Sequence, residues 1–288
     1  MSLPLRVALC QHDASDDPEI CWNRFREQAH EAALQGATLI LTQELFMGPY
    51  FCQGQEVRHF DRAEPIPGPT TNRLKELAKK LGCVIVGSLF EKRAPGLYHN
   101  TAVVCDADGS LVGVYRKMHI PQDPGFDEKF YFTPGDLGFR AFDTAVGRIG
   151  VLICWDQWYP EAARLTALQG AEILIYPTAI GWDDLEDPAL RPVQYEAWQI
   201  SMRAHAIANG VFVAAPNRTG REERLEFWGG SFLADPEGRL LHQSSHQSPE
   251  VAVVDCDRNR IEKARQIWPF LRDRRIDAFE GILQRWGN

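Results

Sequence analysis

The 288-residue sequence has no apolar run long enough to cross a membrane and no low-complexity segment. A membrane-spanning helix needs about 20 consecutive apolar residues. Basic clusters are also scarce: the net charge is −8, and the basic stretch RDRR at 272–275 contains an acid. Nucleic-acid phosphates are bound by clustered Lys and Arg. These absences argue against membrane and nucleic-acid partners.

Paired cysteines are missing as well. The count is odd and no C-x-x-C pair occurs, which is typical of reduced thiols in a cytoplasmic protein. The N-terminus lacks the charged-then-apolar order of a signal peptide. His242 and His246 have metal-like spacing, but the stretch LHQSSHQS offers no third ligand. We therefore predict no disulfide and no metal. The seven cysteines are Cys10, Cys21, Cys52, Cys83, Cys105, Cys154 and Cys256.

What the sequence does contain is an internal repeat. Residues 6–45 and 149–179 both run strand, helix, Gly, strand, and both carry an AL-Q-G-A pattern before the second strand. Three pairs of glycines follow the repeat at separations of 134, 128 and 129 residues: Gly36 and Gly170, Gly82 and Gly210, Gly109 and Gly238. We expect these glycines to adopt the left-handed conformation that ends helices or turns hairpins.

The repeat predicts an α/β fold built from two related halves, about 1–145 and 146–260, followed by a tail at about 261–288. No Pro- or Ser-rich linker separates the halves, so we predict one domain over 1–288 with helices outside buried strands. In this alignment Cys10 of VALCQ takes the place of Cys154 of VLICW.

Three predicted strands end in chemically competent residues. The strand ATLILTQE ends at Glu44, LVGVYRK ends at Lys117 and IGVLIC ends at Cys154. A thiol that attacks, a carboxylate that takes its proton and an ammonium that stabilises an oxyanion together suit acyl transfer. Each residue also has an ordinary interpretation: a solvated Glu, a surface-paired Lys, or a Cys packed as a small apolar side chain.

At these residues the chain resembles the nitrilase superfamily of carbon–nitrogen hydrolases. The matching segments are TQELF around Glu44, YRKMHIP around Lys117 and GVLICWDQWYPEAAR around Cys154, and a second acid of the family matches Glu128 in DPGFDEKFYFTPGD. The resemblance implies a four-layer αββα sandwich. It also implies a homodimer or larger homo-oligomer, with the C-terminal tail crossing to the partner, and catalysis with neither metal nor organic cofactor.

The resemblance further implies roles for individual residues. Glu44 would activate the Cys154 thiol, while Lys117 and the backbone N–H of Trp155 would bind the oxyanion. Glu128 would orient Lys117 or the substrate amide. Other residues expected near the substrate are Tyr50, Thr178, Trp182 and Asp183.

The likeness is greatest to the branch that hydrolyses N-carbamoylputrescine, with CWDQWYPEAAR and GAEILIYPTAIG as the matching segments. Relatives that act on N-carbamoyl D-amino acids place arginines just after the Cys, where this chain has Asp156 and Gln157. We therefore expect a small-molecule substrate with no carboxylate near its carbamoyl group.

Acids of the following loop could meet a substrate ammonium, or they could simply be solvated: Asp183, Asp184, Glu186 and Asp187. Alternatives to an N-carbamoyl amine are an ω-amide, another aliphatic amide or a ureido acid. A binding protein without catalysis is the alternative outside enzymes.

Overall fold

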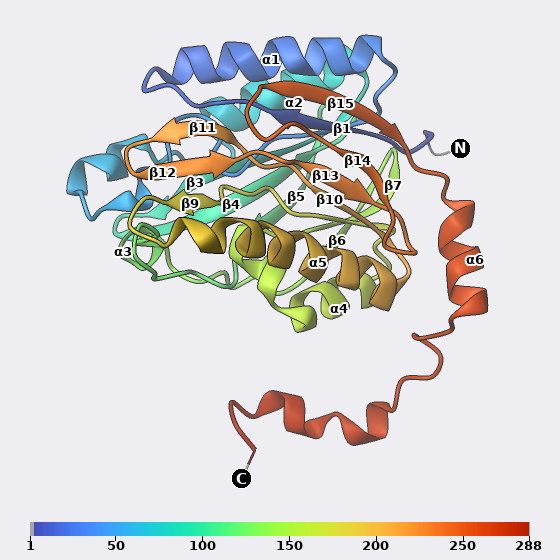
Figure 1. The fold of residues 1–288 in the computed structure, drawn as a ribbon. Coiled ribbons are helices and arrows are strands. Elements are labelled where there is room, and N and C mark those ends of the chain that lie inside the picture. The colour runs from blue at the N-terminus through green and yellow to red at the C-terminus, as the bar shows by residue number, and fades with distance from the viewer. Residues whose placement is uncertain (1–2, 288) are drawn as a thin grey trace.

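The computed structural model describes residues 3–287, in which two six-stranded sheets pack face to face between layers of helices (Figure 1). Helices α1 (Pro18–Leu34) and α2 (Pro69–Leu81) cover one sheet, and α4 (Pro160–Leu168) and α5 (Arg191–Asn209) cover the other. This arrangement confirms the predicted four-layer αββα sandwich.

The two sheets have the same pattern of strand pairing. From one edge to the other, the pairs are antiparallel, parallel, parallel, antiparallel and antiparallel in each sheet. The first sheet is β15 (Glu250–Asp255), β1 (Arg6–Gln11), β2 (Leu39–Leu41), β3 (Val84–Ala94), β4 (Leu97–Cys105) and β5 (Leu111–Arg116). The second is β6 (Ala141–Thr144), β7 (Gly147–Val151), β8 (Ile173–Ile175), β10 (Phe212–Ala215), β13 (Phe232–Ala234) and β14 (Leu240–Gln243).

The halves exchange one strand each. Strand β6 lies in the first half of the sequence but pairs with β7 in the second sheet. Strand β15 lies in the second half but pairs with β1 in the first sheet. A third, small sheet is formed by β9 (Gly181–Asp183), β11 (Thr219–Glu222) and β12 (Leu225–Trp228).

Proline and glycine mark the ends of the four covering helices. Each helix has Pro in its first two positions, where the missing N–H costs no hydrogen bond. Helices α2 and α5 end at Gly82 and Gly210, whose φ values of 65° and 58° lie in the left-handed region. All six glycines of the predicted pairs have positive φ, which confirms that part of the repeat.

The alignment of Cys10 with Cys154 is wrong by two residues. Val7 pairs with Leu39 in the first half, and Ile149 pairs with Ile173 in the second. Val7 and Ile149 are therefore equivalent, and five residues further along each strand lie His12 and Cys154. Cys10 lies within β1, where its thiol is fully buried. The shared letters in VALCQ and VLICW misled the alignment because an apolar strand carries little information about register.

Strand residues alternate between two cores. Val7 and Leu9 of β1 face the second sheet, whereas Ala8 and Cys10 face the helices. Both faces of the central strands are thus buried, which explains their nearly continuous apolar sequences.

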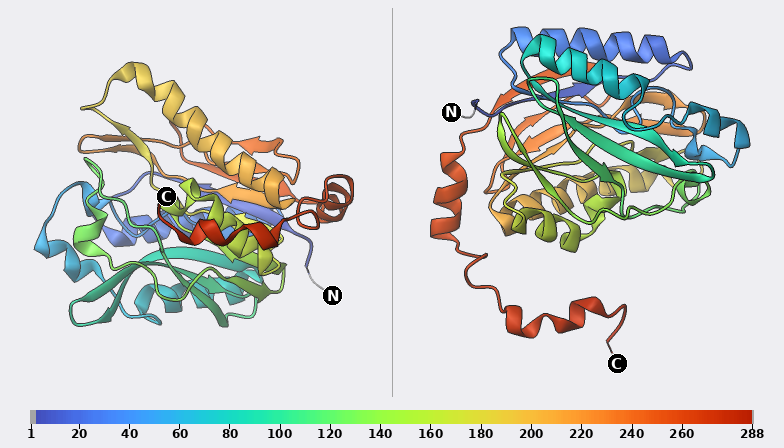
Figure 2. Two further views of the ribbon diagram at one scale, coloured as in Figure 1. Left: turned by 90° about the horizontal axis from the view of Figure 1, so that it is seen from below. Right: turned by 180° about the vertical axis from the view of Figure 1, so that it is seen from behind.

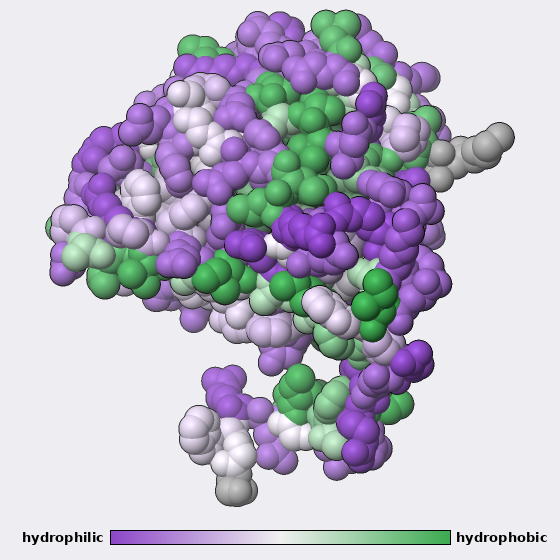
Figure 3. Space-filling view, turned by 45° about the vertical axis from the view of Figure 1, so that its right-hand side comes forward, coloured by the Kyte–Doolittle hydropathy of each residue, from purple (hydrophilic) through white to green (hydrophobic). Residues whose placement is uncertain are grey.

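Beyond α6 (Asn259–Ile267) the chain leaves the body and runs alone (Figure 2). In Figure 3 this tail carries green, hydrophobic patches. Its exposed large apolar side chains are Trp268, Phe270, Ile276, Phe279, Ile282, Leu283 and Trp286. The limits of the domain and tail stay a prediction. Between residues 3 and 287, no helix combines the length and apolar character needed to cross a membrane.

Candidate active site

Cys154 occupies a sharp turn between β7 and a short 3-10 helix, Cys154–Trp158. Its φ of 40° is uncommon for a residue with a side chain and costs of order 1–3 kcal/mol. The backbone N–H of Cys154 donates to the carbonyl of Pro177 at 3.0 Å. The turn carries the thiol out of the sheet and into a cavity.

Asp156 holds this turn from behind. Its buried carboxylate accepts hydrogen bonds from the backbone N–H of Ile153 (3.0 Å) and the hydroxyl of Tyr115 (2.7 Å). It also contacts His119 twice, at the backbone N–H (3.0 Å) and at ring Nδ1 (2.7 Å). Because His119 follows Lys117 by two residues, Asp156 ties the lysine's loop to the cysteine's turn.

Lys117 lies between two carboxylates in a cluster with no solvent exposure. Its Nζ is 2.8 Å from Glu44 Oε1 and 2.7 Å from Glu128 Oε2. Burial alone would lower the pKa of Lys117, but the charges of Glu128 and Glu44 outweigh it and hold that pKa well above its usual value. Lys117 is therefore a permanent cation at this position.

Glu44 has one occupied and one free carboxylate oxygen. Its Oε1 accepts from Asn100 Nδ2 at 2.7 Å and from Lys117 Nζ. Its Oε2 is buried without a hydrogen-bond partner among residues 3–287. A buried acceptor without a partner is costly. The free oxygen is therefore suited to take up a proton.

Burial raises the pKa values of both Cys154 and Glu128. Burial, and then the negative charge of Glu44, raise the pKa of the Cys154 thiol well above its usual value. The resting nucleophile is thus a neutral thiol that needs a base. Glu128 accepts from the Tyr50 hydroxyl at 2.7 Å, and burial raises the pKa of Glu128 to about 7 although Lys117 opposes this rise.

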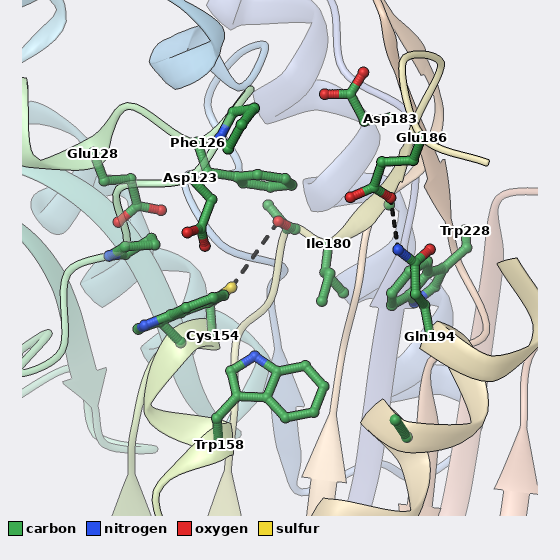
Figure 4. A pocket seen from close by; sticks show the side chains of 16 residues that line it. Asp123, Phe126, Glu128, Cys154, Trp158, Ile180, Asp183, Glu186, Gln194 and Trp228 are labelled. Atoms are coloured by element: carbon green, nitrogen blue, oxygen red, sulfur yellow. Dashed lines mark hydrogen bonds between the residues drawn. The ribbon is translucent and has the colours of Figure 1, made fainter. Parts of the chain in front are cut away.

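A cavity of about 450 Å³ opens in front of the thiol (Figure 4). Four predicted site residues line it: Glu128, Cys154, Trp155 and Asp183. Five others are not among its lining residues: Glu44 and Lys117 of the buried cluster, and Tyr50, Trp182 and Thr178. The hydroxyl of Tyr50 donates to Glu128 at 2.7 Å, and Nε1 of Trp182 donates to the carbonyl of Arg191 at 3.1 Å. The hydroxyl of Thr178 donates to the carbonyl of Tyr176 at 2.8 Å.

The far end of the cavity is acidic. Asp183 is paired with Arg224 at 3.1 Å, and Glu186 accepts from Gln194 at 2.6 Å. Asp123 projects into the space in front of Cys154 (Figure 4). Within the described chain, the residues that line the cavity include no Lys, Arg or His.

The two residues after Trp155 do not contact the cavity. Asp156 faces Tyr115 and His119, and Gln157 accepts from Trp198 Nε1 at 2.8 Å in the core. Both are buried polar residues, and Asp156 fixes the turn. The inference drawn from the absence of arginines at these two positions, a substrate with no carboxylate near its carbamoyl group, stays a prediction.

Sequence reasoning missed several residues around the site. Asn100 is a polar residue within the buried strand LYHNTAVVC, and Arg218 follows the apolar strand FVAA in PNRTG. A polar residue inside or just after a buried strand is the signal that could have located both. Asp123, Trp158 and Trp228 line the cavity without a comparable signal. Within residues 3–287, no three His, Cys, Asp or Glu side chains are grouped as a metal site.

The fold and this constellation agree with comparisons with known proteins. Residues 6–266 match the model of the carbon–nitrogen hydrolase family, and the chain belongs to that family. It is 44% identical to the N-carbamoylputrescine amidase of Arabidopsis thaliana, covering 98% of this chain and 96% of that protein. It is 38% identical to the citrullinase of Francisella tularensis, with coverages of 98% and 99%.

A solved structure is also very similar. The crystal structure of a carbon–nitrogen hydrolase from Helicobacter pylori superposes with a TM-score of 0.96 at 43% identity, covering 99% of this chain and all of that one. The predicted resemblance to carbon–nitrogen hydrolases is thus confirmed, and the chain is an amidohydrolase by family.

Proposed function

We propose that this protein hydrolyses an N-carbamoyl amine through a covalent intermediate on Cys154. The free Oε2 of Glu44 carries the proposal, because Glu44 is also the charge that acts most strongly on the buried thiol. A neutral thiol beside an unpartnered carboxylate oxygen is the arrangement that general-base activation of a nucleophile requires.

In the first stage, Glu44 takes the thiol proton as sulfur attacks the carbamoyl carbon. Lys117 and the backbone N–H of Trp155, in the first turn of its short helix, stabilise the oxyanion. The C–N bond to the terminal nitrogen breaks, and ammonia leaves with the proton from Glu44. An S-carbamoyl intermediate remains on Cys154.

In the second stage, Glu44 removes a proton from water, which attacks the same carbon. The C–S bond breaks and the thiol regains its proton. The released carbamic acid decomposes to an amine and CO₂. Glu128 acts by positioning Lys117, since it supplies two oxygens to the ammonium at 2.9 and 2.7 Å.

The acidic end of the cavity favours a substrate with a terminal ammonium. Asp123 and Glu186 line the cavity without a facing cation among the lining residues. N-carbamoylputrescine, the substrate named by the Arabidopsis relative, has the ammonium that such a wall would attract.

One observation favours a second substrate. Arg224, which is not itself a lining residue, lies 3.1 Å from the lining residue Asp183, so a cation stands just behind an anion of the cavity wall. Such a pair complements an α-amino acid, whose ammonium and carboxylate are adjacent. Citrulline, the substrate implied by the name of the Francisella relative, carries this group.

An assay of ammonia release from N-carbamoylputrescine, from citrulline and from an ω-amide tests these alternatives. We expect rapid release from N-carbamoylputrescine, and at least a tenfold rise in KM after Glu186→Gln. If citrulline is instead turned over faster than N-carbamoylputrescine, and Arg224→Gln abolishes that turnover, citrulline is the substrate. Binding without turnover of any compound, and with no difference in Cys154→Ala, would indicate a non-catalytic protein.

We also propose a cytoplasmic homo-oligomer that uses no metal or organic cofactor. The apolar side chains of the tail need a covering surface, and α4 and α5 expose further apolar residues: Leu165, Leu168, Val193 and Ile200. All seven cysteines are free, as in reducing compartments. Light scattering should give a mass of at least two chains, and deletion of 268–288 should reduce it. A chelator should leave the rate of ammonia release unchanged.

A further inference from the structure

Arg218 lies behind the proposed base, and the mechanism above does not use it. Its side chain is fully buried, between β10 and β11. Its Nη2 donates to the backbone carbonyls of Glu44 (2.7 Å) and Leu45 (3.1 Å). Its Nη1 donates to the carbonyl of Gly48 (3.2 Å) and to Glu222 Oε1 (2.7 Å). One guanidinium thus contacts three carbonyls of a single segment.

The segment it contacts needs such support. The backbone of Leu45 has a φ of 48°, a left-handed value that is unfavourable for a residue with a Cβ. This turn begins directly after Glu44, and it sets the direction from which the carboxylate approaches Lys117. A planar group with several fixed donors can hold successive carbonyls in one geometry, whereas an ammonium cannot.

Glu222 extends the same support to the other carboxylate. Its Oε1 pairs with Arg218, and its Oε2 accepts from the backbone N–H of Tyr50 at 2.5 Å. The hydroxyl of Tyr50 in turn holds Glu128. The buried pair Arg218–Glu222 therefore fixes both ends of segment 44–50, and with them the carboxylates on either side of Lys117.

We propose that Arg218, assisted by Glu222, is a positioning residue for the base Glu44. It reaches from the second half of the sequence to the backbone of the first, and it fixes the backbone from which the Glu44 carboxylate projects. A buried charge is costly to maintain, so a merely structural link would be equally well served by apolar packing. The proposal rests on the proposed role of Glu44 as base, but not on the identity of the substrate.

The test measures how fast iodoacetamide alkylates Cys154, followed by mass spectrometry with Cys154→Ala as the background. This reaction needs the activated thiol but no substrate. In Arg218→Lys we expect the alkylation rate and kcat to fall by about 100-fold, the loss typical of a catalytic group displaced by about 1 Å. We expect KM to stay within twofold. Arg260→Lys is the matched control, because its pair with buried Asp235 lies outside the cavity.

A double-mutant cycle separates positioning from general stability. In a Glu44→Gln background the base is already lost, so Arg218→Lys should slow alkylation no further. An equal slowing in both backgrounds, or a loss no larger than that of Arg260→Lys, would overturn the proposal. If Arg218→Lys does not fold, Glu222→Gln serves instead: it keeps the guanidinium but removes its anion, and it should slow alkylation in the same Glu44-dependent way.

The two proposals can fail separately. Absence of ammonia release together with Glu44- and Arg218-dependent alkylation would reject the proposed substrates and keep the positioning role. Normal ammonia release with an Arg218→Lys variant as reactive as the parent would keep the function and reject that role.

Discussion

The two sheets share one pattern of pairing, yet their strand ends carry different chemistry. Where β7 leads to Cys154, the equivalent end of β1 leads to His12; where β8 leads to Thr178, β2 leads to Glu44. His12 is buried, and burial lowers the pKa of its imidazole to about 4, so it is neutral. Glu44 and Thr178 meet directly, since the backbone N–H of Glu44 donates to the carbonyl of Thr178 at 3.2 Å.

This comparison teaches that the repeat supplies equivalent positions but not equivalent functions. One site is assembled from both halves: the nucleophile comes from the second sheet, and the base and the ammonium come from the first. His12, the counterpart of Cys154, is not among the residues that line the cavity in front of Cys154.

The largest expected effect distinguishes the thiol of the second half, Cys154, from the thiol in β1 of the first, Cys10. Cys154→Ala should lower ammonia release by at least about 1,000-fold, because it removes the nucleophile. Cys10→Ala should leave the rate within twofold, since that thiol packs against helices in the core. Ammonia assays on both purified variants check this. A Cys10→Ala protein as inactive as Cys154→Ala would contradict the assignment.

The next effect concerns Glu128, one of the two carboxylates beside Lys117, both of which come from the first half. Because the pKa of Glu128 is raised to about 7, the folded state binds its proton more tightly than the unfolded chain does. The stabilisation is therefore full at pH 4 and is lost as the pH rises through 7, by up to about 3 kcal/mol. Urea unfolding of parent and Glu128→Gln at pH 5 and pH 8 measures it. The variant should show the smaller fall in unfolding free energy, and equal falls would refute this prediction.

The smallest expected effect is a difference in stability between substitutions at two equivalent glycines, Gly82 and Gly210. Gly82→Ala should cost about 1–2 kcal/mol, because a Cβ is strained at its φ of 65° although no atom obstructs it. Gly210→Ala should cost more, since its Cβ would also lie 2.9 Å from Cγ of Arg265 in α6. Thermal unfolding of the two variants gives both values. A Gly82→Ala protein less stable than Gly210→Ala would contradict the order.

The sequence predicted two related halves with helices outside buried strands, because glycine positions and apolar strands depend on local physics, whereas the four-layer sandwich was implied by the family resemblance. It also named Glu44, Lys117 and Cys154, because each lies at the end of a predicted strand, whereas Glu128, at the start of α3 (Glu128–Tyr131), came only from the family resemblance. It failed on register, where Cys10 was placed two residues from its true counterpart. Such errors arise because a strand's neighbours, rather than its letters, decide which face and position a side chain takes.

The partners of Glu44 were beyond local reasoning. Asn100 and Arg218 reach it across 56 and 174 positions of the chain. Strand pairing within the first sheet brings Asn100 to Glu44, and the packing of the two halves brings Arg218, so no spacing rule in the sequence could have revealed them.

The exchange of β6 and β15 has a consequence for synthesis on the ribosome. The chain emerges from its N-terminus, so β1 appears among the first residues, but its edge partner β15 spans Glu250–Asp255. Until that strand emerges, β1 remains an open edge, and open edges pair readily with other chains. The first half can form its helices and most of its sheet early, yet the nascent protein stays exposed to aggregation until nearly the whole of it has been made.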